Sequence, residues 1–262
     1  MEKPEISIIL PGIRPYNWSK LYDSIVKSTT RGFELIVVGP YRPPDMLQNN
    51  IYNFKYVKDY GSPMRASNIG ALLCEGKLVT WVADDAVLLP ESLDKNIDLL
   101  YTMGDDTKNV VVAKYYEGDD HDDKPLQPDR YFKVNGADCT RSPFLSDDWW
   151  LFNVAIMHRS FFDSLGAWDC SFEACPMGHT DLAIRAQHAG ANVAMSEFPL
   201  LDCGHMPGTT GDHAPIHYAQ LGHDTPRFQQ RYRDPEWVNR PTEIDINNWK
   251  DSPTIWKRRF LI

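Results

Sequence analysis

The 262-residue sequence lacks any apolar run long enough to cross a membrane, since such a helix needs about 20 apolar residues. Residues 1–5 lead directly into an apolar stretch, so we expect no secretion signal. The five cysteines include no Cys-x-x-Cys pair, which is typical of reduced thiols in the cytosol. We therefore expect a cytoplasmic protein whose association with membranes is at most peripheral.

Positive charge is also scarce, because 27 Lys and Arg residues stand against 36 Asp and Glu residues. The resulting net charge of −9 argues against a general nucleic-acid binder, which would carry a basic surface. It also means that a phosphorylated substrate would need a metal cation or a local cluster of Arg and Lys. The length is sufficient for one large domain with a small appendage.

Apolar runs typical of buried strands alternate with helical periodicity over the first 115 residues. The expected strands are residues 5–11, 33–39, 53–58, 77–83 and 109–115. The expected helices are residues 18–29, 62–75 and 90–103. This alternation predicts an α/β fold, with a mostly parallel sheet that is flanked by helices on both faces.

The pattern changes after residue 115. Residues 116–148 read as an excursion of loops and short strands, rich in acids and proline. Regular elements are then expected again, as strands at 151–157 and 192–196 and helices at 158–165 and 180–188. From residue 201 to the end, proline, glycine and histidine are frequent, which predicts a loop-rich C-terminal extension that wraps the domain.

The most informative motif is Asp84-Asp85, which directly follows the apolar strand expected at 77–83. Two acids at the end of a buried strand are costly unless a positive charge compensates them. Ligands of open α/β sheets bind at this edge, so a divalent cation held for a phosphorylated substrate is the simplest explanation. The alternative is a solvated pair of acids at the start of the next helix.

Several segments in this order resemble family 2-like glycosyltransferases with the GT-A fold, a Rossmann-like α/β fold. The resemblance covers residues 5–200. It is carried in the first half by residues 7–11, 33–38, 65–70 and 81–85, and in the second half by 153–159, 165–169 and 181–185.

The resemblance implies a metal-dependent enzyme that moves a sugar from a nucleoside-diphosphate sugar, with inversion at the anomeric carbon. Residues 1–200 would form the catalytic domain, with a nucleotide and metal half at 1–115 and an acceptor half at 116–200. The implied cofactor is Mn²⁺ or Mg²⁺, and the acceptor is a glycan or a lipid-linked molecule.

The same resemblance assigns candidate residues to the donor site. Asp85 would ligate the metal, and a late histidine, His205, would be a further ligand. The candidates for contact with the nucleotide are Pro11, Arg14, Asp59, Arg65, Asn68 and Asp84. Arg65 could bind a phosphate or anchor one of the acids at the strand end.

The sequence departs from the family pattern at three places: Gly39-Pro40 replaces acids after the second strand, Ala83 replaces the first acid of the metal motif, and Gly178-His179 replaces Glu-Asp. The general base is then Asp181, at the expected first turn of a helix, or His179, whose ordinary pKa lies near neutral pH. Asp148 with Trp149 and Trp150 is a candidate acceptor surface, although core packing explains tryptophans equally well.

Three other interpretations remain open. A nucleotidyltransferase would need a Gly- and Lys-rich phosphate loop, which residues 11–15 do not provide. A catalytically inactive nucleotide-sugar-binding protein is consistent with Gly178-His179. His213 and His217, with Cys203 near in sequence, would suit a separate zinc site, but Pro215 between them weakens a helix there.

The terminal residues 255–262 mix cations with apolar side chains, so they could rest on an anionic membrane or dock on the protein.

Overall fold

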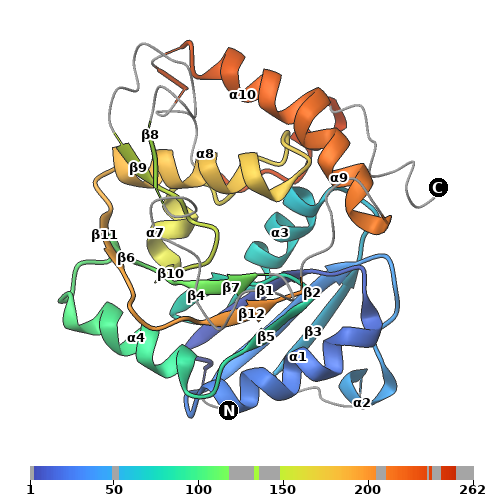
Figure 1. Ribbon diagram of the computed structural model, residues 1–262, viewed down its shortest axis with the longest axis vertical. Helices are drawn as coiled ribbons and strands as arrows, with labels where there is room; N and C mark the ends of the chain where they lie inside the picture. The colour runs from blue at the N-terminus through green and yellow to red at the C-terminus, as the bar shows by residue number, and fades with distance from the viewer. Residues whose placement is uncertain are drawn as a thin grey trace.

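The computed structural model describes residues 3–48, 53–117, 133–135, 148–204, 211–234, 236–237 and 243–251. A central sheet divides the molecule into layers (Figure 1). Helices α1 and α4 lie on one face, and α3, α7 and α8 lie on the other, with α9 and α10 further out beyond α8. The mostly parallel sheet flanked by helices confirms the predicted fold class.

The strands are β1 (Ile6–Pro11), β2 (Phe33–Gly39), β3 (Phe54–Lys58), β4 (Leu78–Trp81), β5 (Ala86–Leu88), β6 (Asn109–Val112), β7 (Tyr115–Glu117), β8 (Lys133–Asn135), β9 (Asp148–Trp150), β10 (Ala155–His158), β11 (Asn192–Met195) and β12 (Leu201–Cys203). The α-helices are α1 (Pro15–Ser28), α2 (Asp45–Gln48), α3 (Pro63–Leu72), α4 (Ser92–Thr102), α7 (Arg159–Ser164), α8 (Cys175–His188), α9 (Ala214–Ala219) and α10 (Thr225–Arg231). Shorter helical turns are η1 (Gly211–His213), η2 (Gln220–Asp224) and η4 (Asn248–Asp251).

The central sheet has the strand order β11-β6-β10-β4-β1-β2-β3. Strand β1 is parallel to both of its neighbours, from Ile6 opposite Phe33 in β2 and Leu78 in β4. Strand β10 is antiparallel to β4 and β6. Because β1 and β4 run side by side in the same direction, the loops after Pro11 and Trp81 meet at one edge of the sheet.

Burial explains why these segments form the sheet. Ile6, Ile8, Ile9 and Leu10 of β1 have no exposed surface, and the middle of β2 is equally buried. Strands covered on both faces are read in the sequence as continuous apolar runs, which is how they were predicted. Helix α3 begins where expected, since the Ser62 side chain accepts a hydrogen bond from the Arg65 backbone N–H.

A small second sheet, with the order β5-β12-β7, stands next to this edge. Cys203 of β12 is paired with Ala86 of β5 on one side and with Glu117 of β7 on the other. The sheet therefore carries the chain directly after Asp85 and holds it, through β12, next to the start of the acidic excursion.

One predicted boundary is wrong in a way that affects the site. Helix α8 begins at Cys175, five residues before the expected start at Thr180, so Asp181 lies in its second turn. The C-terminal extension, predicted to be rich in loops, contains the short helices α9 and α10. Pro215 does not interrupt α9 because it occupies the first turn, where no backbone N–H bond is lost.

Candidate functional site

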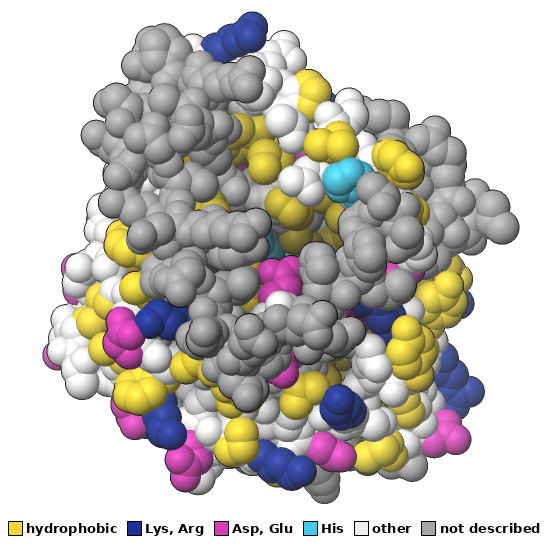
Figure 2. Space-filling view, in the orientation of Figure 1, with side chains coloured by type: hydrophobic (Ala, Val, Ile, Leu, Met, Phe, Trp, Pro, Cys, Tyr) yellow, Lys and Arg dark blue, Asp and Glu magenta, His cyan; other side chains and the backbone are white. Residues whose placement is uncertain are grey.

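A cavity of about 900 Å³ opens at the edge where β1 and β4 end. It is bordered by the loops after these strands, the start of α8, the small sheet and the C-terminal helices. Figure 2 shows this face as a hollow with hydrophobic side chains at its wall and acidic side chains near its centre. Of the predicted site residues, Pro11, Arg14, Asp84, Asp85 and His179 line the cavity.

The carboxylate of Asp84 holds the loop that follows β1. Its Oδ2 atom accepts hydrogen bonds from the backbone N–H groups of Ile13, at 2.6 Å, and Arg14, at 2.7 Å. Its Oδ1 atom accepts a bond of 2.5 Å from Nη1 of Arg14. The Asp84 side chain is only 5 % exposed, and both oxygens are engaged, so this residue shapes the loop.

Asp85 is the carboxylate that faces the cavity, with 19 % of its side chain exposed. Burial raises its pKa above the ordinary value of 3.8, and the positive charge of Arg14 opposes that rise. The nearest guanidinium nitrogen, Nη1 of Arg14, lies 3.4 Å from Oδ2. That separation exceeds the ~2.8 Å of a charge-assisted hydrogen bond, so Asp85 is less tightly engaged than Asp84.

The cation beside the acidic pair is Arg14, which the sequence interpretation had assigned to the nucleotide. Arg65, the predicted anchor for a strand-end acid, instead lies in another part of the molecule. Burial lowers the pKa of Arg14, but the hydrogen bond to Asp212 and the charges of Asp84, Asp85 and Asp212 raise it above its ordinary value overall. Arg14 is therefore a permanent positive charge in the floor of the cavity.

Carboxylates outnumber guanidinium groups in the ion pairs of the described residues at this edge: Arg14 alone pairs with Asp84, Asp85 and Asp212. The described residues contain no group of three or more metal-ligating side chains. A divalent cation would fit here as Mg²⁺ often binds, through one carboxylate, Asp85, together with oxygens of a phosphate substrate.

His179 lies in the cavity wall near two tryptophans. Its ring centroid is 5.5 Å from that of Trp81 and 6.0 Å from that of Trp168. Burial lowers the pKa of His179 to about 3, so the expectation of titration near neutral pH is wrong. The imidazole is neutral at pH 7 and can accept or donate a hydrogen bond there, but it is a weak proton acceptor.

The neighbouring residue, Gly178, explains one departure from the family pattern. A side chain at this position would overlap the thioether of Met64 in α3, because α3 and α8 approach closely here. A glutamate at position 178 would therefore require the Met64 side chain to move. Gly39 is constrained in the same way, since a Cβ atom there would meet the carbonyl oxygen of Gly12.

Asp181 lies in the interior and does not line the cavity. Its carboxylate binds Nε of Arg185 at 2.9 Å and accepts 3.0 Å hydrogen bonds from the Tyr232 hydroxyl and the Trp237 indole. The argument for Asp181 as the base depended on a place in the first turn of a helix, and that place is wrong. The structure instead gives this carboxylate the function of joining α8 to the C-terminal segment.

Asp59, Arg65 and Asn68 also bind other parts of the protein and do not line the cavity. Asp59 pairs with Arg65 at 3.1 Å, and Arg65 donates to the carbonyl of Ile246. Asn68 is fully buried and donates to the carbonyl of Trp168 at 2.6 Å. Arg65 and Asn68 thus fasten the C-terminal segment and the loop before α8 to helix α3.

The two tryptophans of the predicted acceptor surface pack in or against the core, which was the alternative left open by the sequence. Trp149 is buried in the core, and Trp150 is packed against it and held through Gln187. The cavity is lined by Leu151 and Asn153, which follow them. The side chain of Asp148 is not among the described parts, and His205 and residues 255–262 lie outside the described residues.

The structure also places at the cavity residues that were not predicted from the sequence. Asp212 reaches Arg14 from the C-terminal segment, and Glu117 and Asn153 line the cavity. No motif marks Asp212, which stands in a stretch rich in glycine and proline and beyond the family resemblance. His213, considered above for zinc, lines the cavity, whereas His217 does not.

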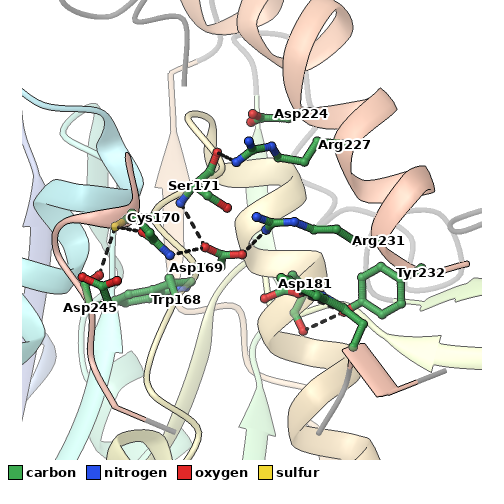
Figure 3. A network of polar contacts seen from close by, with 12 residues as sticks. Trp168, Asp169, Cys170, Ser171, Asp181, Asp224, Arg227, Arg231, Tyr232 and Asp245 are labelled. Carbon is green, nitrogen blue, oxygen red and sulfur yellow. Dashed lines mark hydrogen bonds and ion pairs between the residues drawn. The ribbon is translucent and has the colours of Figure 1, made fainter. Parts of the chain in front are cut away.

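Buried carboxylates attach the C-terminal segment to the loop before α8 (Figure 3). Asp169 accepts hydrogen bonds from Arg231 and, at 2.7 Å, from Asn248. Asp224, with no exposed surface, accepts bonds from the backbone N–H groups of Glu173 and Ala174, where α8 begins. The segment therefore fixes the end of α8 that carries His179.

No helix among the described residues is both long and apolar enough to span a bilayer. No family model matches the chain. The sequence is 26% identical over 151 residues to an uncharacterized glycosyltransferase of Rickettsia prowazekii (strain Madrid E). That match covers 54% of this chain and 46% of the relative, so it spans less than half of the relative's length.

The fold belongs to the GT-A-like class of α/β folds. It is similar to that of residues 1–349 of S. aureus TarS solved with UDP, with a TM-score of 0.57 and 14% identity over 89% of this chain and 72% of that one. The TarS structure solved with UDP-GlcNAc gives a TM-score of 0.55 at 13% identity, over the same shares of the two chains. At this identity the likeness establishes the fold.

Proposed function

We propose that this protein is a glycosyltransferase that uses a nucleoside-diphosphate sugar and a divalent cation, Mn²⁺ or Mg²⁺. The observation that carries the proposal is the cavity at the ends of β1 and β4, with Asp85 facing it and three carboxylates around Arg14. The glycosyltransferase relative and the nucleotide complexes of TarS support the same class.

The chain's own residues have distinct tasks in this proposal. Asp84 and Arg14 hold the loop after β1, whose backbone and Pro11 face the nucleotide. Asp85 holds the cation together with the diphosphate of the donor. A bound cation would neutralise the diphosphate as it leaves the sugar. Without such a cation, the excess of carboxylates would repel the anionic donor.

The acceptor would enter from the wall formed by α8 and the small sheet. Inverting transfer needs one group that takes the proton of the acceptor hydroxyl. Among the described side chains on the cavity wall, the imidazole of His179 and the carboxylate of Glu117 are candidates for this task. Because the pKa of His179 is about 3, we assign His179 to orienting the hydroxyl by a hydrogen bond and Glu117 to accepting its proton.

The first test measures binding of UDP and UDP-GlcNAc by thermal shift, with and without Mn²⁺, and release of UDP from the donor. We expect stabilisation that requires the metal. Asp85→Asn should lower UDP release by about 100-fold or more, because one carboxylate ligand is lost. Asp105→Asn, which neutralises an exposed acid on the loop after α4, is the matched control and should behave as the wild type.

The second candidate is a protein that binds a nucleotide sugar without transferring it. The observation that favours it is the weak basicity of His179, in the position where the family carries an acid. Metal-dependent binding of UDP-GlcNAc without any release of UDP would support this candidate. If UDP is released slowly by water, Glu117→Gln should reduce the release and His179→Asn should change it less.

A further inference from the structure

Arg14 stands between three carboxylates that come from two distant parts of the chain. Asp84 and Asp85 follow β4, whereas Asp212 belongs to η1 in the C-terminal segment, 198 residues away from Arg14. Asp212 engages the side of the guanidinium in a bidentate manner, with Nε to Oδ2 and Nη2 to Oδ1 both at 2.8 Å. This planar, two-point contact fixes the orientation of a guanidinium more firmly than a single bond does.

The orientation decides which carboxylate the remaining nitrogen reaches. With Nε and Nη2 on Asp212, Nη1 points at Asp84 at 2.5 Å and stays 3.4 Å from Asp85. Only 9 % of the Arg14 side chain is exposed, so water cannot replace a lost carboxylate partner well. Asp85 already lies 3.4 Å from Nη1, so a guanidinium released by Asp212 would have this carboxylate within reach.

We propose that Asp212 is a positioning residue of the donor site: by holding Arg14 on Asp84, it keeps the guanidinium from closing its 3.4 Å ion pair with Asp85 into a hydrogen bond and leaves Asp85 available to a divalent cation. This inference depends on the proposed function and adds to it a residue from outside the family resemblance. It makes the C-terminal segment a part of the donor site. It also gives the bidentate contact between Arg14 and Asp212 a role that a mere surface ion pair would not have.

The test titrates Mn²⁺ into the protein in the presence of UDP and follows unbound Mn²⁺ by electron paramagnetic resonance. Asp212→Asn should weaken the affinity for Mn²⁺ by about tenfold, since Arg14 then competes for Asp85. Asp212→Glu keeps the carboxylate and should recover most of the affinity. Asp234→Asn removes one charge from an exposed position of the same segment and should leave the affinity unchanged.

A double variant separates positioning from simple charge. In an Arg14→Met background no guanidinium can capture Asp85, so adding Asp212→Asn should cause no further loss of Mn²⁺ affinity. If Asp212→Asn costs the same in both backgrounds, Asp212 acts only through its charge, and the proposal is overturned. An unchanged Mn²⁺ affinity in the single variant overturns it as well.

The outcomes also separate this inference from the proposed function. If the wild type binds Mn²⁺ with UDP and Asp212→Asn does so equally well, the function stands and the inference falls. If the wild type responds to neither UDP nor UDP-GlcNAc with Mn²⁺, both fall. Asp212 is 29 % exposed, so folding should survive its substitution, and Asp212→Ser provides a second variant that lacks the carboxylate.

Discussion

The central sheet and the C-terminal segment are held in place by different combinations of forces. Strand β1 is secured by apolar residues without exposed surface, such as Ile8 and Leu10. The segment from η1 to η4 also buries Phe228 and Tyr232, but it depends in addition on hydrogen bonds to the buried carboxylates of Asp169 and Asp181 and from Asp224 to the start of α8. Apolar burial is tolerant of geometry, whereas each polar contact requires a particular partner at a particular distance. The part of the site built by the sheet is therefore more robust than the part built by the segment.

Asp181→Ala should cause the largest loss of stability among the substitutions in the C-terminal half. The substitution leaves Arg185, only 2 % exposed, without its carboxylate and removes the acceptor for Tyr232 and Trp237. We expect a loss of about 3–5 kcal/mol in the free energy of unfolding, measured by urea denaturation. Ile8→Ala in the sheet is the comparison and should cost about 2–5 kcal/mol. A loss below 1 kcal/mol for Asp181→Ala would contradict the role assigned to this carboxylate.

Asp224→Ala should destabilise the C-terminal segment while leaving the central sheet intact. It removes the acceptor of the N–H groups of Glu173 and Ala174, at a cost of about 1–3 kcal/mol for buried donors left unsatisfied. We expect limited proteolysis to cut within residues 211–234 while the sheet domain remains resistant. The experiment contradicts our description if cleavage begins in the sheet, or if the variant is as resistant as the wild type.

The smallest expected effect is a pH dependence caused by His179. In the unfolded chain a histidine has a pKa of about 6.5, whereas in the folded protein burial lowers the pKa of His179 to about 3. Between these values the unfolded state takes up a proton that the folded state does not. The free energy of unfolding is therefore highest above pH 6.5 and falls as the pH drops below that value, by up to about 2 kcal/mol at pH 5.

His179→Asn should remove this part of the acid sensitivity. Chemical denaturation at pH 7 and pH 5 gives the difference in unfolding free energy for both proteins. A wild type and variant with parallel pH profiles would mean that His179 titrates normally in the folded protein. His188, exposed near the end of the same helix, provides the control substitution His188→Asn.

The same comparison explains what could be predicted from the sequence. The strands Ile6–Pro11 and Phe33–Gly39 were found almost to the residue, because continuous apolar runs are a local signal. Asp84, Asp85 and Arg14 were placed at the site because they follow predicted strands at one edge of a parallel sheet. Long-range polar pairs have no such signal, and this is why Asp212 was missed.

Helix α8 illustrates the same limit. Thr180 has the character of a cap, but the helix begins at Cys175 because Asp224, 50 residues later in the chain, binds the Ala174 N–H. That error moved Asp181 from a helix terminus to the interior. Arg65 and Asn68 were misassigned for a related reason: their partners, such as the carbonyls of Ile246 and Asp245, are backbone atoms of a region with weak periodicity.

Gly178 has a consequence for how this protein could be altered. Since its missing side chain is what allows Met64 and α8 to touch, an acidic residue installed there would push against the Met64 thioether. Rebuilding the acidic pair of the family would therefore be easier if Met64 were shortened at the same time. The two positions are coupled, because a larger residue at 178 calls for a smaller or displaced one at 64.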